Sequence, residues 1–107
     1  MPTYNKLVRD KIPEIIKNSG KDLKTKILSE DRYIKKLKLK LNEEVTEYQD
    51  ATTDNEAIEE LADVLELMHA LASIHGASIE EVEKLRKEKA VKRGGFKDKI
   101  FLIEVED

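Results

Sequence analysis

The stretch that decides the fold is residues 41–83, which read LNEEVTEYQDATTDNEAIEELADVLELMHALASIHGASIEEVE. It contains 13 Asp or Glu residues and no Lys or Arg. The flanking segments are basic, because residues 1–40 hold 12 Lys or Arg against 5 Asp or Glu and residues 84–107 hold 8 against 5. An acidic centre between basic arms suits a metal with an anionic ligand around it, although ordinary solvated helix faces give the same pattern.

Apolar spacing predicts two long helices around this centre. Ser29 is a candidate N-cap for a helix over about residues 30–51. Thr53-Asp54-Asn55-Glu56 has the pattern of a capping box, in which the Thr53 hydroxyl binds the Glu56 N–H and the Glu56 side chain reaches back to the Thr53 N–H. The helix that follows is apolar on more than one face and ends at His75-Gly76, so we expect it to be the buried central helix.

Two shorter helices are predicted outside this pair. The first begins with Asp10 or Ile12 as its cap, has Pro13 in its first turn and ends near Asn18-Ser19-Gly20. The other opens at a second capping box, Ser78 to Glu81, and runs to about Lys92 before Gly94-Gly95. The tail Ile100-Phe101-Leu102-Ile103-Glu104-Val105 is apolar and β-branched, which is compatible with a strand or a packed extension.

Together these elements predict an all-α fold, an antiparallel bundle of four helices in a single domain over residues 1–107. With 107 residues and 39% apolar content, the core of one subunit is thin. We therefore expect oligomerisation to complete the bundle. The chain has no cysteine, no apolar leader and no membrane-length apolar run, so we expect a cytoplasmic protein with no membrane or nucleic-acid partner.

Carboxylates occupy core positions on both long helices. The apolar stripe of the first helix, with Leu37 and Leu41, leads inward to Glu44, and Glu47 shares that face three residues later. On the second helix the stripe reaches Glu60, with Asp63 one turn on. A short turn joins the two helices, so they should pack antiparallel and bring both pairs to one end of the hairpin.

Such a carboxylate cluster needs a compensating cation, because burying unpaired like charges is costly. We expect no Lys or Arg of these segments to supply it, since residues 41–83 contain none. Mg²⁺ suits the position, because it prefers hard oxygen ligands and is commonly shared with substrate phosphates. Each acidic frame alone is common on charged helices, but two frames at core positions of consecutive helices favour metal binding.

The same residues resemble a known family. Lys40 to Glu47 and Glu60 to Leu65, separated by a 12-residue spacer, resemble the E-x-x-E and E-x-x-D signature of the MazG-like all-α nucleoside triphosphate pyrophosphohydrolases. The opening Tyr4 to Pro13 and the late Lys92-Arg93-Gly94-Gly95-Phe96 are similar to a small branch of that superfamily related to phosphoribosyl-ATP pyrophosphohydrolase. The resemblance covers residues 4 to about 97.

The resemblance implies a homodimer or homotetramer in which Glu44, Glu47, Glu60 and Asp63 bind Mg²⁺, with Mn²⁺ as a substitute, and serve catalysis. It implies hydrolysis of a nucleotide substrate between the α and β phosphates, giving a monophosphate and pyrophosphate in a house-cleaning role. The expected phosphate-binding residues are Lys6, Arg9, Lys11, Lys89 and Arg93. For any one of these cations, an ordinary solvated position is an equally reasonable interpretation.

Two other functions fit the sequence less well. One is the phosphoribosyl-ATP step of histidine biosynthesis, which matches the carboxylates better than it matches the terminal motifs. The other is a non-catalytic helical module that binds nucleotide or assembles, although such a module has no need for charge on its core stripes. His69 and His75 lack a metal-ligand partner at i+4, which favours structural roles for both.

Overall fold

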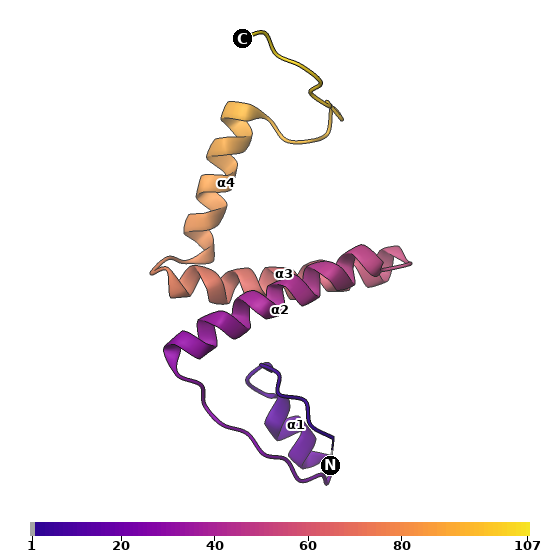
Figure 1. Cartoon of the computed structure of the whole chain (residues 1–107), viewed down its shortest axis with the longest axis vertical. Coiled ribbons are helices and arrows are strands. Elements are labelled where there is room, and N and C mark those ends of the chain that lie inside the picture. The colour runs from indigo at the N-terminus through magenta and orange to yellow at the C-terminus, as the bar shows by residue number, and fades with distance from the viewer. Residues whose placement is uncertain (1) are drawn as a thin grey trace.

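The computed structural model describes residues 2–107 and is all-helical (Figure 1). It contains four helices, and residues 2–107 form no strand. The helices are α1 (Ile12–Asn18), α2 (Glu30–Asp50), α3 (Asp54–Ile74) and α4 (Ile79–Arg93). The prediction of an all-α chain with four helices is therefore confirmed.

The centre of the molecule is an antiparallel hairpin of α2 and α3. Ser29 caps α2 by accepting a hydrogen bond from the Arg32 N–H (3.4 Å), as predicted. Leu37 from α2 and Leu67 from α3 are buried, and Ala72 is the third buried apolar residue. The two helices are held side by side by this small apolar contact, which fixes the relative placement of the acidic residues they carry.

The turn between α2 and α3 differs from the predicted capping box in one bond. The Thr53 hydroxyl does accept from the Glu56 N–H (3.1 Å). The Glu56 carboxylate, however, accepts from the N–H (3.2 Å) and the hydroxyl (3.3 Å) of Thr52, not from the N–H of Thr53. Thr52 offers the Glu56 carboxylate two donors, its N–H and its hydroxyl, whereas the N–H of Thr53 offers one. This explains why the Glu56 side chain binds Thr52 and not Thr53.

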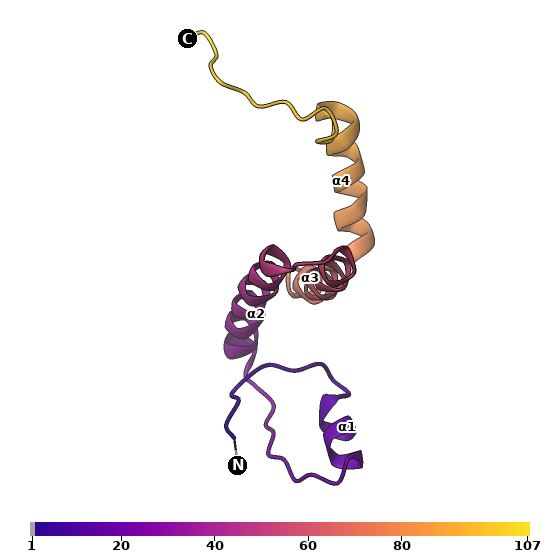
Figure 2. The same cartoon turned by 90° about the vertical axis from the view of Figure 1, so that its right-hand side faces the viewer.

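α1 is a separate short helix. Its N-cap is Lys11, without a side-chain bond, so the prediction of Asp10 or Ile12 as the cap was wrong. Pro13 lies in the first turn and the helix stops before Gly20, which has a φ of +85° that favours glycine. Among the described residues α1 contacts no other helix, and Figure 2 shows it below the hairpin, joined to α2 by an extended connector.

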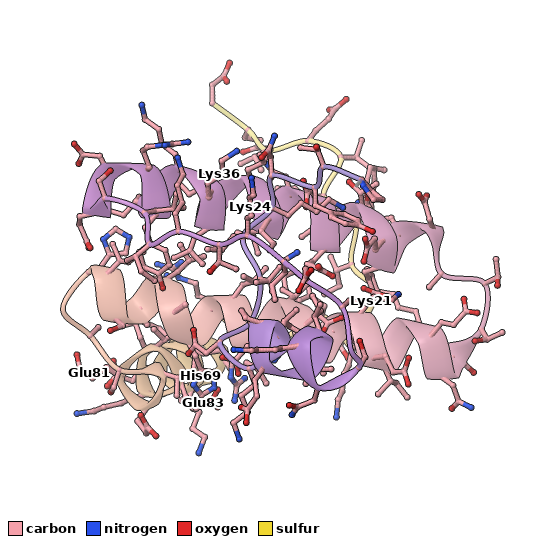
Figure 3. All side chains as sticks on the ribbon, turned by 90° about the horizontal axis from the view of Figure 1, so that it is seen from below. Lys21, Lys24, Lys36, His69, Glu81 and Glu83 are labelled. Carbon is pink, nitrogen blue, oxygen red and sulfur yellow. The ribbon has the colours of Figure 1, made fainter. Side chains whose placement is uncertain are left out.

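α4 leaves the hairpin at the end of α3, across a short turn, and points away from α2 (Figure 1). The Ser78 hydroxyl caps it by accepting from the Glu81 N–H (3.2 Å), and Gly94 ends it with a φ of +84°. In the view from below, His69, Glu81 and Glu83 lie at this α3–α4 end, and Lys21 lies toward the opposite end of the hairpin (Figure 3). Both His69 and His75 are exposed.

The single chain is open in shape. Its radius of gyration is 18.5 Å, whereas a compact domain of this length has about 13 Å. α3 is not the buried helix that its sequence predicted, because only Leu67 and Ala72 of it are buried. Its large exposed apolar residues form one stripe, the α3 seam, made of Ile58, Leu61, Leu65 and Met68. The predicted four-helix packing is thus not made within one chain, and its completion by other subunits stays a prediction.

The C-terminal residues continue away from α4 without regular structure (Figure 2). The apolar side chains of residues 100–105 are largely exposed. A strand in this segment would need a partner strand, and residues 2–107 offer none. None of the four helices is long and apolar enough to pass through a lipid bilayer.

Candidate metal centre

Three carboxylates meet between α2 and α3. Glu44 and Glu47 lie one turn apart on α2, and Glu60 lies opposite them on α3. One carboxylate oxygen from each of the three lies within 4.8 Å of the others. The antiparallel hairpin produces this meeting, since the last turns of α2 face the first turns of α3. The convergence predicted from the two acidic frames therefore holds for these three residues.

The three side chains differ in exposure. Glu44 is buried, with 9% of its surface exposed, and Glu60 is half-buried, whereas Glu47 is exposed. Glu44 Oε2 and Glu60 Oε2 are buried without any hydrogen-bond partner. Buried polar atoms are nearly always paired in folded proteins, so two orphaned oxygens in one place call for an unseen partner.

The cluster holds protons more strongly than isolated carboxylates do. The pKa of Glu60 is raised from 4.5 to about 7, chiefly by desolvation and further by the nearby carboxylates of Glu47 and Glu44. Burial also raises the pKa of Glu44, with a further contribution from Glu47. In the absence of a compensating cation, one proton shared within the cluster reduces the repulsion.

Two basic side chains from outside residues 41–83 do reach the acidic residues, so other parts of the chain supply positive charge that the acidic stretch lacks. Lys40 Nζ lies 3.7 Å from Glu44 Oε1, one turn earlier on α2. Arg9 Nη2 lies 2.8 Å from Asp63 Oδ1. Lys40 immediately precedes the Lys- and Arg-free stretch, and its i,i+4 spacing from Glu44 is a signal that was present in the sequence. Neither contact satisfies Glu44 Oε2 or Glu60 Oε2.

This donor set fits a hard divalent cation. The available atoms are carboxylate oxygens from two helices, the type of ligand that Mg²⁺ and Mn²⁺ prefer. The two unpartnered oxygens are the atoms that a bound cation would satisfy. An acidic group is common on protein surfaces without a metal, but orphaned buried oxygens within one are not, and they are what favours a binding site here.

Asp63 lies beside the cluster without being part of it. It follows Glu60 by one turn of α3, and its charge contributes to the raised pKa of Glu44. Its carboxylate accepts a hydrogen bond from Arg9, and the compact group of convergent oxygens contains only the other three residues. Of the four predicted ligands, the structure therefore brings three together and pairs the fourth with an arginine.

The predicted phosphate-binding residues near the N-terminus have different surroundings. Lys6 lines a shallow hollow on α2 with Asn42, Glu43, Thr46 and Glu47, which places it next to the cluster. Arg9 is bound to Asp63. Lys11 is the cap residue of α1, the helix that contacts no other. Lys6 and Arg9 are thus positioned near the carboxylates.

Lys89 and Arg93 lie in the last turns of α4, far from the carboxylates of the same chain. The cluster is near the α2–α3 turn, whereas α4 departs from the other end of α3 and points away from the hairpin (Figure 1). Both residues are exposed. Lys89 and Arg93 therefore do not face the carboxylates of their own chain. They could act only at the carboxylate cluster of a second subunit.

Comparisons with known proteins give one partial match. No family model matches the chain, and no solved structure matches it. The chain is 47% identical over 53 residues to a protein of Mycolicibacterium smegmatis described as an uncharacterized protein. The match covers 50% of this chain and 54% of that protein, so the chain matches about half the length of its curated relative.

Proposed function

We propose that the protein is a nucleoside triphosphate pyrophosphohydrolase that depends on a divalent cation, Mg²⁺ or its substitute Mn²⁺. The observation that carries the proposal is the cluster of Glu44, Glu47 and Glu60, with two buried oxygens that lack a partner. The resemblance of residues 4–97 to the MazG-like pyrophosphohydrolases supports the choice of reaction. The reaction is hydrolysis between the α and β phosphates, which gives a nucleoside monophosphate and pyrophosphate.

Each side chain has a definite task in this proposal. Glu44, Glu47 and Glu60 hold the cation, and Asp63, whose charge acts on Glu44, joins them when it leaves Arg9. The cation supplies charge neutralisation at the phosphate oxygens and acidity to water. Lys6, in the hollow beside Glu47, offers an ammonium group to a phosphate. Glu47 is the exposed carboxylate, so it is the one that substrate and solvent reach first.

We also propose that the active form is a homodimer or homotetramer. The radius of gyration of 18.5 Å and the exposed α3 seam support it, because a single chain leaves its apolar helix face in water. In such an assembly Lys89 and Arg93 of one subunit serve the site of another. The cytoplasmic location and the house-cleaning role belong to the same proposal.

The test is a panel of canonical and damaged nucleoside triphosphates, with phosphoribosyl-ATP included, incubated with Mg²⁺ and analysed for products. Monophosphate plus pyrophosphate supports the proposal, whereas diphosphate plus orthophosphate contradicts it. Turnover of phosphoribosyl-ATP alone would favour the histidine-pathway reaction. Binding of nucleotide without any turnover would instead favour a non-catalytic module.

The matched variants are Glu60→Gln and Glu59→Gln. Both change a glutamate of the same turn of α3, but only Glu60 belongs to the cluster, and Glu59 is exposed. Glu60→Gln should lower kcat/KM by at least about 100-fold, because the metal that this carboxylate holds stabilises the charge that develops on the phosphates during the reaction. Glu59→Gln should retain native activity. Equal activity of the two variants would remove the cluster from the reaction.

A further inference from the structure

The N-terminal segment of residues 2–11 lies against the hairpin that holds the cluster. Asn5, Lys6 and Leu7 line one hollow together with residues of α2, namely Lys36, Leu39, Lys40 and Glu43. Leu7 is the half-buried residue of this segment. Two residues later, Arg9 reaches α3 and donates its hydrogen bond to Asp63 across 54 positions of sequence. The segment therefore touches both helices of the site.

Arg9 and a cation at the cluster would compete for one carboxylate. Asp63 lies one turn after Glu60 on α3, and its charge acts on Glu44. It is also the only one of the four predicted ligands that is bound to an arginine. A carboxylate oxygen that turns toward a bound cation gives up its favourable approach to the guanidinium, and the cation repels that group.

We propose that Arg9 is a built-in competitor of the metal: it holds Asp63 while the site is empty, and a divalent cation displaces it when Asp63 becomes a ligand. The inference rests on the proposed function, because it assumes a metal at Glu44, Glu47 and Glu60. The exchange needs no change in protonation of Arg9, since a guanidinium stays charged throughout the physiological range. The released side chain then lies beside the loaded site, where a phosphate group would bind.

The size of the effect follows from the exposure of the pair. Its side chains are 55% and 40% exposed, and ion pairs of this kind change an equilibrium by about twofold to fivefold. Arg9→Gln removes the competing charge, so it should tighten Mg²⁺ binding by about that factor. By linkage, metal binding must weaken the Arg9–Asp63 contact to the same extent.

The experiment is calorimetric titration of the full chain with Mg²⁺, without nucleotide. The native protein, Arg9→Gln, Asp63→Asn and the double variant are compared. The control is Arg86→Gln, which breaks an arginine–glutamate pair of similar exposure on α4. Arg9→Gln should tighten binding, Arg86→Gln should leave it unchanged, and Asp63→Asn should weaken it. In the Asp63→Asn background, Arg9→Gln should have a much smaller tightening effect, because the contested carboxylate is gone and only the repulsion between Arg9 and the cation remains.

Thermal melting of the same four proteins supplies a second readout. With chelator, the effects of Arg9→Gln and Asp63→Asn should be non-additive, as expected of two side chains in contact. With saturating Mg²⁺ they should become additive. An unchanged or weaker Mg²⁺ affinity in Arg9→Gln, or equal coupling with and without Mg²⁺, would overturn the exchange while leaving the metal site standing. No Mg²⁺ binding by any of the proteins would overturn the proposed function as well.

Discussion

At the scale of one residue, Glu60 is a carboxylate that is shielded from water without a cation to compensate its charge. Its Oε2 is buried without a partner, and its pKa is raised from 4.5 to about 7. The raised value means that the folded protein holds a proton there that the unfolded chain releases. A metal at the cluster would reverse this preference, since a cation favours the ionised carboxylate.

The metal-free protein should consequently lose stability as pH rises. The contribution of Glu60 is fully present below pH 4.5, declines above it and is lost as pH rises through about 7, because the folded state binds more protons than the unfolded state in that window. Urea melts in chelator at pH values from about 5 to 8 should show this decline. In Glu60→Gln the decline should be much smaller, since glutamine does not titrate. A slope identical to the native one would mean that Glu60 keeps its ordinary pKa.

The contact between Arg9 and Asp63 was beyond the reach of sequence reasoning. The convergence of Glu44, Glu47 and Glu60 follows from helical spacing and one short turn, which are local features. Arg9, by contrast, lies 54 residues from Asp63, in a segment without regular structure. Its place depends on how the chain folds back over α2, which no periodicity encodes. Lys40 was within reach, because an i,i+4 pair with Glu44 is a helical pattern.

At the scale of the helices, the caps were the most predictable features. Ser29, Thr53 and Ser78 each accept the N–H three residues on, as the sequence motifs indicated. The course of α4 and the isolation of α1 were not predictable, because they depend on contacts between elements. The exposure of α3 was not predictable for the same reason. An apolar helix face predicts that the face packs against something, but it does not say whether the partner is the same chain or another.

The cap at Thr53 matters more than the others, because it starts the helix that carries Glu60. Thr53→Ala should lower the free energy of unfolding by about 1 kcal/mol, since the Glu56 N–H loses its acceptor. Thr46→Ala is the matched control, because the Thr46 hydroxyl only donates to the Asn42 carbonyl one turn earlier in α2. Alanine is the better helix former there, so the control should be neutral or slightly stabilising.

Urea denaturation of the two threonine variants checks this comparison in chelator, so that metal affinity does not enter. If Thr53→Ala were as stable as Thr46→Ala, water would replace the hydroxyl without loss, and the start of α3 would not depend on its cap. A loss for Thr53→Ala alone would show that the local bond at the turn contributes to the stability of the whole hairpin.

At the scale of the whole molecule, the unusual feature is the amount of apolar surface left on one helix. Ile58, Leu61, Leu65 and Met68 follow one another at spacings of three, four and three, which places them on one side of α3. Their exposures run from 64% at Ile58 to 38% at Met68. A stripe with this spacing is the pattern by which one helix packs along another.

We therefore expect a homodimer or homotetramer that buries the α3 seam. Leu61 and Leu65 are 50% and 49% exposed in the single chain. Leu61→Glu and Leu65→Glu should each shift the protein toward the monomer, because a buried unpaired carboxylate opposes association. Ile27→Glu is the matched control, since Ile27 is 98% exposed in the connector before α2 and belongs to no stripe. It should leave the oligomeric state unchanged.

Light scattering coupled to size exclusion, over a range of micromolar concentrations, measures the result. A native protein that is monomeric throughout the range would contradict the expected assembly. The same samples also test whether Lys89 and Arg93 act across subunits. If they serve a partner's site, monomeric Leu61→Glu should lose nucleotide turnover while it keeps Mg²⁺ binding, because its own Glu44, Glu47 and Glu60 remain on one hairpin. If Leu61→Glu lost both turnover and Mg²⁺ binding, the substitution would have disrupted the α2–α3 hairpin itself.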